Sequence, residues 1–120
     1  MPRRDVRMYL HDIEQAAQRV ARLTDGKSLV EYQADENLRL IVERSFEIIG
    51  EALRQAIDAK PVLADHITKA RQIIDLRNTL IHAYHMIDPV ILWGIIESHL
   101  PLLRREIKSL LDSDNLFQQD

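Results

Sequence analysis

Apolar side chains recur every three or four residues along almost the whole chain, which is the spacing of one face of an α-helix. The first of these runs steps through Val6, Leu10, Ile13, Ala17 and Val20. Glycines and prolines number three and four in 120 residues, too few for the many turns of a β-sandwich or barrel. The pattern therefore predicts an all-α fold, an up-and-down helical bundle of about four to five helices.

Turn and capping signals divide the pattern into segments. We expect helices over about 3–23, 29–59 (with a break near 33–35), 66–86 and 89–112, and a short piece at 62–66. Gly26 is expected to end the first helix in a left-handed conformation, and Ser28 with Glu31 forms a capping-box pattern. Asp88 precedes Pro89 as an N-cap precedes a first-turn proline. Pro101, inside the last helix, predicts a kink.

The core of the second helix can be assigned from the same spacing. Its expected buried residues are Leu38, Ile41, Val42, Ser45, Ile48, Ile49, Ala52, Ala56 and Ile57. The small residues at positions 45, 52 and 56 would let another helix approach closely.

Length and composition indicate one domain. Hydrophobic residues make up 46% of the chain, enough for a buried core, and we assign 1–112 to the bundle and 113–120 to a polar C-terminal tail. The net charge of −3 argues against coating nucleic acid through bulk charge, but it does not exclude a local basic site. The sequence has no cysteine, no signal-peptide pattern and no apolar run of membrane-spanning length, so we expect a cytoplasmic protein without a membrane partner.

The expected helix over 66–86 carries a polar face of unusual composition. Projected at about 100° per residue, its apolar and polar residues fall on opposite sides. The apolar stripe is Ile73, Leu76, Leu80, Ala83 and Ile87, and the polar stripe is Arg71, Asp75, Asn78, His82 and His85. A purely structural helix usually fills its outer face with Lys, Glu and Gln. An asparagine and two histidines there indicate a functional surface.

Arg77 and Tyr84 share a flank of this polar face, and Ile74 and Ile81 lie between the flank and the polar stripe. A monomer would expose both isoleucines there, and an exposed apolar strip often marks an interface. We therefore expect a homodimer in which two copies of this helix meet and their polar stripes face one cleft. Arg77 and His82 sit about 140° apart on the helix, but arginine is long enough for both to reach a ligand in such a cleft.

These residue types suit RNA cleavage without a metal ion. Histidine can act as the acid or the base near neutral pH, and arginine binds phosphate through two parallel hydrogen bonds. Asparagine can orient the phosphate or the histidine, and tyrosine can stack on a base. His82 and His85 could bind a metal together with Asp88, but no further ligand cluster accompanies them. We therefore expect neither a metal nor a cofactor.

The stretch RNTLIHAY, residues 77–84, resembles the Arg-x(4–6)-His signature of HEPN domains. The tyrosine that follows gives the Arg-x4-His-x-Tyr form of the HepT toxins. The segments SFEIIGEAL (45–53) and IDPVILWGIIESHLPLLRREI (87–107) resemble the flanking HepT helices. The resemblance covers roughly residues 3–110.

The resemblance implies a homodimeric bundle in which two copies of the motif share one cleft. It further implies the toxin of a toxin–antitoxin pair, an endoribonuclease with Arg77 and His82 as the catalytic pair and Asn78 in support. The implied partner is an MntA-like nucleotidyltransferase antitoxin, which would inactivate the toxin by transferring AMP to Tyr84.

The family pattern does not fix the remaining RNA contacts. Arg71, His85, Arg4 and Arg7 are candidates because each is cationic or can become so. An alternative function stays open at this point, since some HEPN domains are non-catalytic partners of nucleotidyltransferases. The same arginine and tyrosine would then bind a nucleotide or dock the partner without cleaving RNA.

Overall fold

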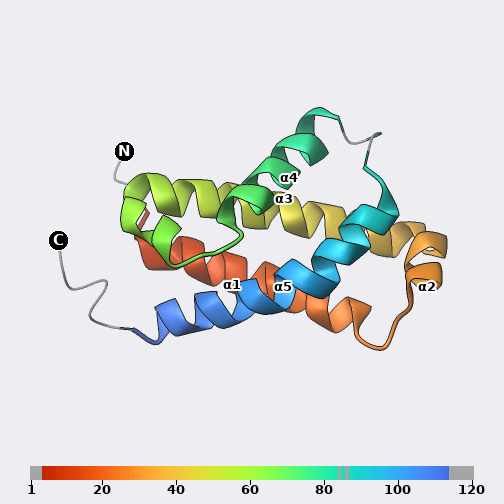
Figure 1. The fold of residues 1–120 in the computed structure, drawn as a ribbon, viewed down its shortest axis with the longest axis horizontal. Coiled ribbons are helices and arrows are strands. Elements are labelled where there is room, and N and C mark those ends of the chain that lie inside the picture. The colour runs from red at the N-terminus through yellow and green to blue at the C-terminus, as the bar shows by residue number, and fades with distance from the viewer. Residues whose placement is uncertain (1–3, 84, 86, 114–120) are drawn as a thin grey trace.

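The computed structural model describes residues 4–83, 85 and 87–113, which form helices and connecting loops without any strand (Figure 1). The helices are α1 (Val6–Thr24), α2 (Leu29–Ala34), α3 (Glu36–Ala59), the 3-10 helix η1 (Pro61–Asp65), α4 (Ala70–His82) and α5 (Pro89–Leu111). The predicted all-α class is therefore confirmed. Apart from Ser113, the tail expected over 113–120 lies outside the described residues.

The packing of the helices places α1 between α3 and α5, while α4 packs mainly against α3. Figure 1 shows the consequence: α4 lies on one side of the bundle, and the seam between α1 and α5 lies on the other. The core is filled by fully buried side chains of several helices, among them Leu10, Ile13, Phe46, Ile49, Leu53, Leu92, Leu103 and Ile107. The bundle therefore has two distinct sides, one formed by α3 and α4 and the other by α1 and α5.

The helix ends follow the local signals. Gly26 has a φ of 73° after α1, the left-handed conformation that glycine adopts without strain. Ser28 and Glu31 exchange the two hydrogen bonds of a capping box at the start of α2. The expected break in the second segment falls at Asp35, whose extended backbone separates α2 from α3 and whose carboxylate accepts from Leu38 N. Asp88 caps α5 by accepting from Val90 N.

Two expectations about the helices were wrong in detail. The third helix was expected over 66–86, but α4 begins at Ala70 and ends at His82. A turn closed by the hydrogen bond from Ala70 N to the Ile67 carbonyl oxygen at 3.2 Å separates η1 from α4, and within it the backbone N–H and hydroxyl of Thr68 donate to the Glu106 carboxylate of α5 at 3.2 and 2.7 Å. Ile41 was expected in the core, yet it is 43% exposed on the outer side of α3.

Pro101 lies inside α5, which continues through it as a helix. Within the part of the chain that the structure describes, no helix combines the length and the apolar character that crossing a membrane requires.

Candidate active site

The site is organised where α4 crosses α3, at Gly50. A Cβ added at Gly50 would lie 2.2 Å from the Cβ of Arg77 and 3.2 Å from the carbonyl oxygen of Ile73. Only a residue without a side chain permits this approach. The approach leaves the Arg77 side chain only 21% exposed.

Gly50 is a site residue that the sequence analysis missed. The small residues named there were those at positions 45, 52 and 56, which flank it on either side. A usable signal was present, because glycine in a helix interior costs about 1 kcal/mol relative to alanine and usually has a packing reason.

The guanidinium of Arg77 is held from two sides. Its Nη1 donates to Oδ1 of Asn78 at 2.9 Å, and its Nη2 lies 3.5 Å from Oε1 of Glu51 on α3. Its Nε is buried and has no hydrogen-bond partner among the described residues. Arg77 was expected on the flank of an exposed face, so the structure places it deeper and braces it more than the helical projection indicated.

Glu51 is itself firmly engaged by another arginine. Arg54 Nε and Nη2 donate to Oε1 and Oε2 of Glu51 at 2.9 and 3.0 Å. These bonds, with smaller contributions from Gln55 and from the charge of Arg77, hold the pKa of the Glu51 carboxyl below its usual range. Because both of its oxygens are already bonded to Arg54, Glu51 makes only a long contact with Arg77. The Arg77 guanidinium is therefore oriented but not saturated, and it can still bind an anion.

A hollow of about 250 Å³ opens beside Arg77. It is lined by Arg4, Tyr9, Asp12, Arg44, Glu47, Ile48, Glu51, Ala52, Gln55, Arg77 and Ile81. Three guanidiniums and an aromatic ring therefore share one surface depression, and these are the groups that bind phosphates and stack on nucleobases. Arg4 is paired with Asp12 at 2.8 Å, and its guanidinium lies 4.8 Å from the centre of the Tyr9 ring.

The other candidate RNA contacts lie elsewhere. Arg7 donates from Nη2 to the carbonyl oxygen of Leu111 at 2.7 Å, so it ties α1 to the last turn of α5. Arg71 is exposed near the start of α4 and borders a different hollow, together with Ile57 and Ala64. Of the four candidates, the structure thus brings Arg4 to the hollow beside Arg77, and it places Arg7 and Arg71 away from it.

The polar stripe of α4 is exposed as expected, from Arg71 to His82. His82 is the last residue of the helix. It lies five residues after Arg77, so the two side chains leave the helix about 140° apart. His85 is also exposed, and Tyr84 lies outside the described residues. Among the described residues, no three His, Cys, Asp or Glu side chains gather in a way that could hold a metal ion.

The apolar strip beside the site differs from the expected one. Ile81 is 41% exposed, but Ile74 is partly buried and packs against the core. The exposed side of α3 contributes Ile41, and Ile48, seven residues further along α3, lines the hollow beside Arg77 together with Ile81. The exposed apolar surface therefore spans α3 and α4 rather than α4 alone.

Comparison with known proteins shows the class of protein to which this chain belongs. A family model described as "Ribonuclease HepT-like" matches residues 13–110. The chain is 32% identical over 108 residues to "Putative RNase MJ1380" of Methanocaldococcus jannaschii, which spans 90% of this chain and 98% of that protein. It is 29% identical over 102 residues to "Probable ribonuclease HepT" of Thermococcus cleftensis, and the match covers 85% of this chain and 92% of that protein. No solved structure matches the chain significantly.

The class is that of ribonucleases with an all-helical fold. The chain belongs to the ribonuclease HepT-like family, as its resemblance to HepT toxins predicted.

Proposed function

We propose that this chain is the toxin of a toxin–antitoxin pair, an endoribonuclease that cuts RNA without a metal ion at a cleft between two protomers. Arg77 and His82 form the catalytic pair, and Asn78 supports Arg77. The observation that carries the proposal is the state of Arg77: it is braced by Glu51 and Asn78 at the edge of a hollow lined by two further arginines and a tyrosine. Membership of a ribonuclease family supports the choice of RNA as substrate.

The proposed reaction is attack of a ribose 2′-hydroxyl on the adjacent phosphorus. The 2′-oxygen forms a bond to phosphorus, the bond to the 5′-oxygen breaks, and the products are a 2′,3′-cyclic phosphate and a 5′-hydroxyl. A neutral imidazole removes the 2′-hydroxyl proton, and a protonated imidazole supplies a proton to the leaving 5′-oxygen. His82 of each protomer provides one of these imidazoles, while Arg77 stabilises the negative charge that grows on the phosphate oxygens.

Two features of the monomer support a shared cleft. Arg77 and His82 leave α4 in directions about 140° apart, so one copy of the helix does not direct both at the same point. Ile81, which is 41% exposed, and Ile48 put apolar surface in the hollow beside Arg77. Pairing through this surface would remove it from water, which is favourable, and it would bring a second copy of the motif to the first.

The role of Asn78 follows from its contact. Its Oδ1 accepts from Nη1 of Arg77, and this fixes the plane of the guanidinium next to the opening of the hollow. The amide nitrogen of Asn78 remains available to donate to a phosphate oxygen.

Inactivation is proposed to occur by AMP transfer to Tyr84 from an MntA-like nucleotidyltransferase antitoxin in the cytoplasm. The tyrosine oxygen would attack the α-phosphorus of ATP, and pyrophosphate would leave. The attached group adds a phosphodiester charge and a bulky base two residues after His82. The new phosphate would compete with the substrate phosphate for Arg77, and the base would block the cleft.

A cleavage assay tests the enzymatic part. Purified protein in EDTA should cut single-stranded RNA and leave 2′,3′-cyclic phosphate ends. His82→Ala should abolish cutting, whereas the matched control His66→Ala, an exposed histidine outside the motif, should leave it unchanged. Equal cutting by the His82→Ala variant and the parent would refute the assignment.

Expression in bacteria tests the toxin–antitoxin part and separates it from a non-catalytic docking module. A toxin should arrest growth, and a co-expressed nucleotidyltransferase should relieve the arrest. The mass of the relieved protein should rise by multiples of AMP that map to Tyr84, and a Tyr84→Phe chain should stay unmodified. Indifferent growth would favour the docking module.

A further inference from the structure

A second hollow is lined by residues of α1 and α5. Figure 1 shows these two helices side by side on the side of the bundle away from α4. Its volume is about 420 Å³, larger than that of the hollow beside Arg77. Its lining includes the buried apolar residues Ile13 and Ala17 of α1 and Ile107 of α5, together with exposed polar and charged side chains of both helices. Nothing in the proposed cleavage reaction uses this hollow.

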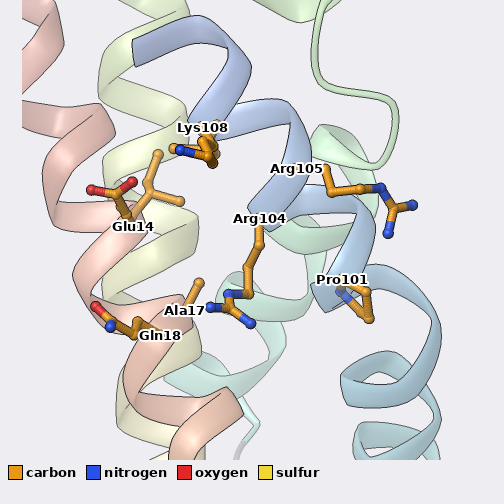
Figure 2. A pocket seen from close by; sticks show the side chains of 9 residues that line it. Glu14, Ala17, Gln18, Pro101, Arg104, Arg105 and Lys108 are labelled. Atoms are coloured by element: carbon orange, nitrogen blue, oxygen red, sulfur yellow. The ribbon is translucent and has the colours of Figure 1, made fainter. Parts of the chain in front are cut away.

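Three cations of α5 line the hollow: Arg104, Arg105 and Lys108. Arg104 and Lys108 are one helical turn apart, and Figure 2 shows both side chains directed toward α1, where Glu14 and Gln18 lie opposite. The guanidinium of Arg105, the next residue, points the other way (Figure 2). Arg104 has no ion pair or hydrogen bond with any residue that the structure describes, and Lys108 has only an exposed pair with Asp112 at 3.6 Å. Arg104 therefore carries a positive charge that no acidic residue neutralises, and such a charge can bind an anion.

The hollow continues along the seam. A neighbouring hollow of about 280 Å³ shares Pro101 and Arg104 with it and extends to Lys27 and Trp93. Arg104 therefore borders both hollows. Apolar recesses next to a cation correspond to the alternation of base and phosphate along an extended nucleic acid strand.

We propose that the seam between α1 and α5 holds a segment of single-stranded RNA away from the cleavage site, with Arg104 and Lys108 on its phosphates. The bases would lie in the two hollows that Arg104 borders. The proposal rests on the proposed ribonuclease function and deepens it, because it names a surface that retains the substrate. The chain carries a net charge of −3, so its attraction for RNA must come from local clusters such as this one.

RNA fits the seam better than an acidic protein helix does. A helix needs one continuous apolar groove, whereas this seam is divided between two hollows. Carboxylates also border it, namely Glu14 at the first hollow and Asp25 and Glu97 at the second. These carboxylates repel phosphates as well as an acidic helix, so a bound strand must keep its phosphates at Arg104 and Lys108. What distinguishes RNA is that its bases carry amino groups, which can donate hydrogen bonds to the carboxylates.

The experiment measures binding without cleavage. A fluorescent single-stranded RNA of about 12 nucleotides is titrated with the full chain carrying His82→Ala, and anisotropy is recorded at several salt concentrations. Adding Arg104→Ala and Lys108→Ala should raise Kd about five- to tenfold, because two phosphate contacts are lost. It should also reduce the slope of log affinity against log salt by about 1 to 1.5.

Arg105→Ala in the same background is the matched control, because it removes an equal charge from the same helix but from a side chain that points away. It should change Kd by less than about twofold. All three side chains are exposed, and circular dichroism should show an unchanged fold.

The possible outcomes separate the alternatives. An unchanged Kd and salt slope in the double variant overturns the proposal. It is also overturned if AMP binds as tightly as the oligonucleotide with the same dependence on Arg104, since the hollow would then be a mononucleotide site. A binding effect seen only with an acidic partner protein overturns it as well. Cleavage by the parent chain is measured separately, so failure of the seam and failure of the nuclease assignment give different results.

Discussion

Gly50 and Arg77 are in contact across the α3–α4 crossing, and a methyl group at Gly50 would lie 2.2 Å from the Cβ of Arg77. Both atoms of that clash lie close to the backbone, so a side-chain rotation cannot relieve it. The two helices would have to move apart, and Arg77 would move relative to its partners Glu51 and Asn78. The spacing of this crossing is therefore a condition for the geometry of the site as well as for packing.

The first prediction concerns this contact. Gly50→Ala should lower the free energy of unfolding by about 1–3 kcal/mol, the usual cost of forcing extra atoms into a packed contact, and it should reduce RNA cleavage. Gly94→Ala is the control, because Gly94 also lies in a helix but nothing lies within 4 Å of its added Cβ. That change should stabilise the protein by roughly 0.5–1 kcal/mol. Urea unfolding of both variants measures the difference, and similar effects at the two glycines would contradict the packing argument.

The second prediction concerns the competition of two arginines for Glu51. Arg54→Met removes both hydrogen bonds from Arg54 to Glu51 and leaves only that from Gln55 to Oε2, so Oε1 can pair more closely with Arg77 and compete with the substrate phosphate. We expect kcat/KM for RNA to fall about tenfold, equivalent to about 1.4 kcal/mol. Adding Glu51→Gln to the same chain should restore most of the activity, since the competing charge is gone.

Arg22→Met, an exposed position on α1 outside the site, is the control for loss of an arginine. If the loss caused by Arg54→Met persists unchanged in the double variant, the competition is not its cause.

The third prediction concerns assembly. Ile81→Asp places a charge on the apolar surface beside Arg77 and should weaken the proposed dimer at least tenfold, because an unpaired charge would be buried at the interface. Sedimentation velocity should show the parent as a dimer and the variant as a monomer at the same concentration, and the variant should lose cleavage activity. Val30→Asp, at a residue of α2 that is 72% exposed, is the control and should change neither property. A parent chain that sediments as a monomer at all concentrations would rule out the shared cleft.

The fourth prediction concerns pH. Burial, and then the charge of Lys69, lowers the pKa of His99 below its ordinary value of 6.5. The folded chain therefore resists protonation of His99, so this residue's contribution to stability is present above about pH 6.5 and is lost as pH falls below it. The melting temperature should decrease between pH 7 and pH 5, and it should decrease less for His99→Gln. His66→Gln, which changes an exposed histidine, should not reduce the decrease to the same extent.

The structure shows which kinds of prediction a sequence supports. The left-handed Gly26, the capping box of Ser28 and Glu31, and the Asp35 break were all predicted, because each depends on residues within one turn of each other. The family and the all-α class were predicted as well, from patterns that extend over most of the chain.

Contacts between distant segments were not predictable in this way. Gly50 matters because α4 reaches it, and Thr68, which precedes α4, bonds to Glu106, 38 residues further along the chain. Ile41 follows the core spacing of its helix but is 43% exposed, because spacing along one helix does not show which of its sides the other helices cover. The opposite error was made for Arg77, which was expected on the flank of an exposed face. The projection of α4 alone contains no information on its neighbour α3, which covers Arg77.

The end of α4 at His82 has one further consequence. The fold of a single chain braces Arg77 through Glu51 of α3, whereas His82 is the last residue of α4 and has no hydrogen bond or ion pair to another helix within the described part of the chain. A chain can therefore be fully folded while its proposed chemistry is still incomplete. If pairing completes it, then at concentrations below the dimer dissociation constant the cleavage rate should rise with the square of protein concentration. The cell could then silence the enzyme by dilution alone, with no loss of folded protein.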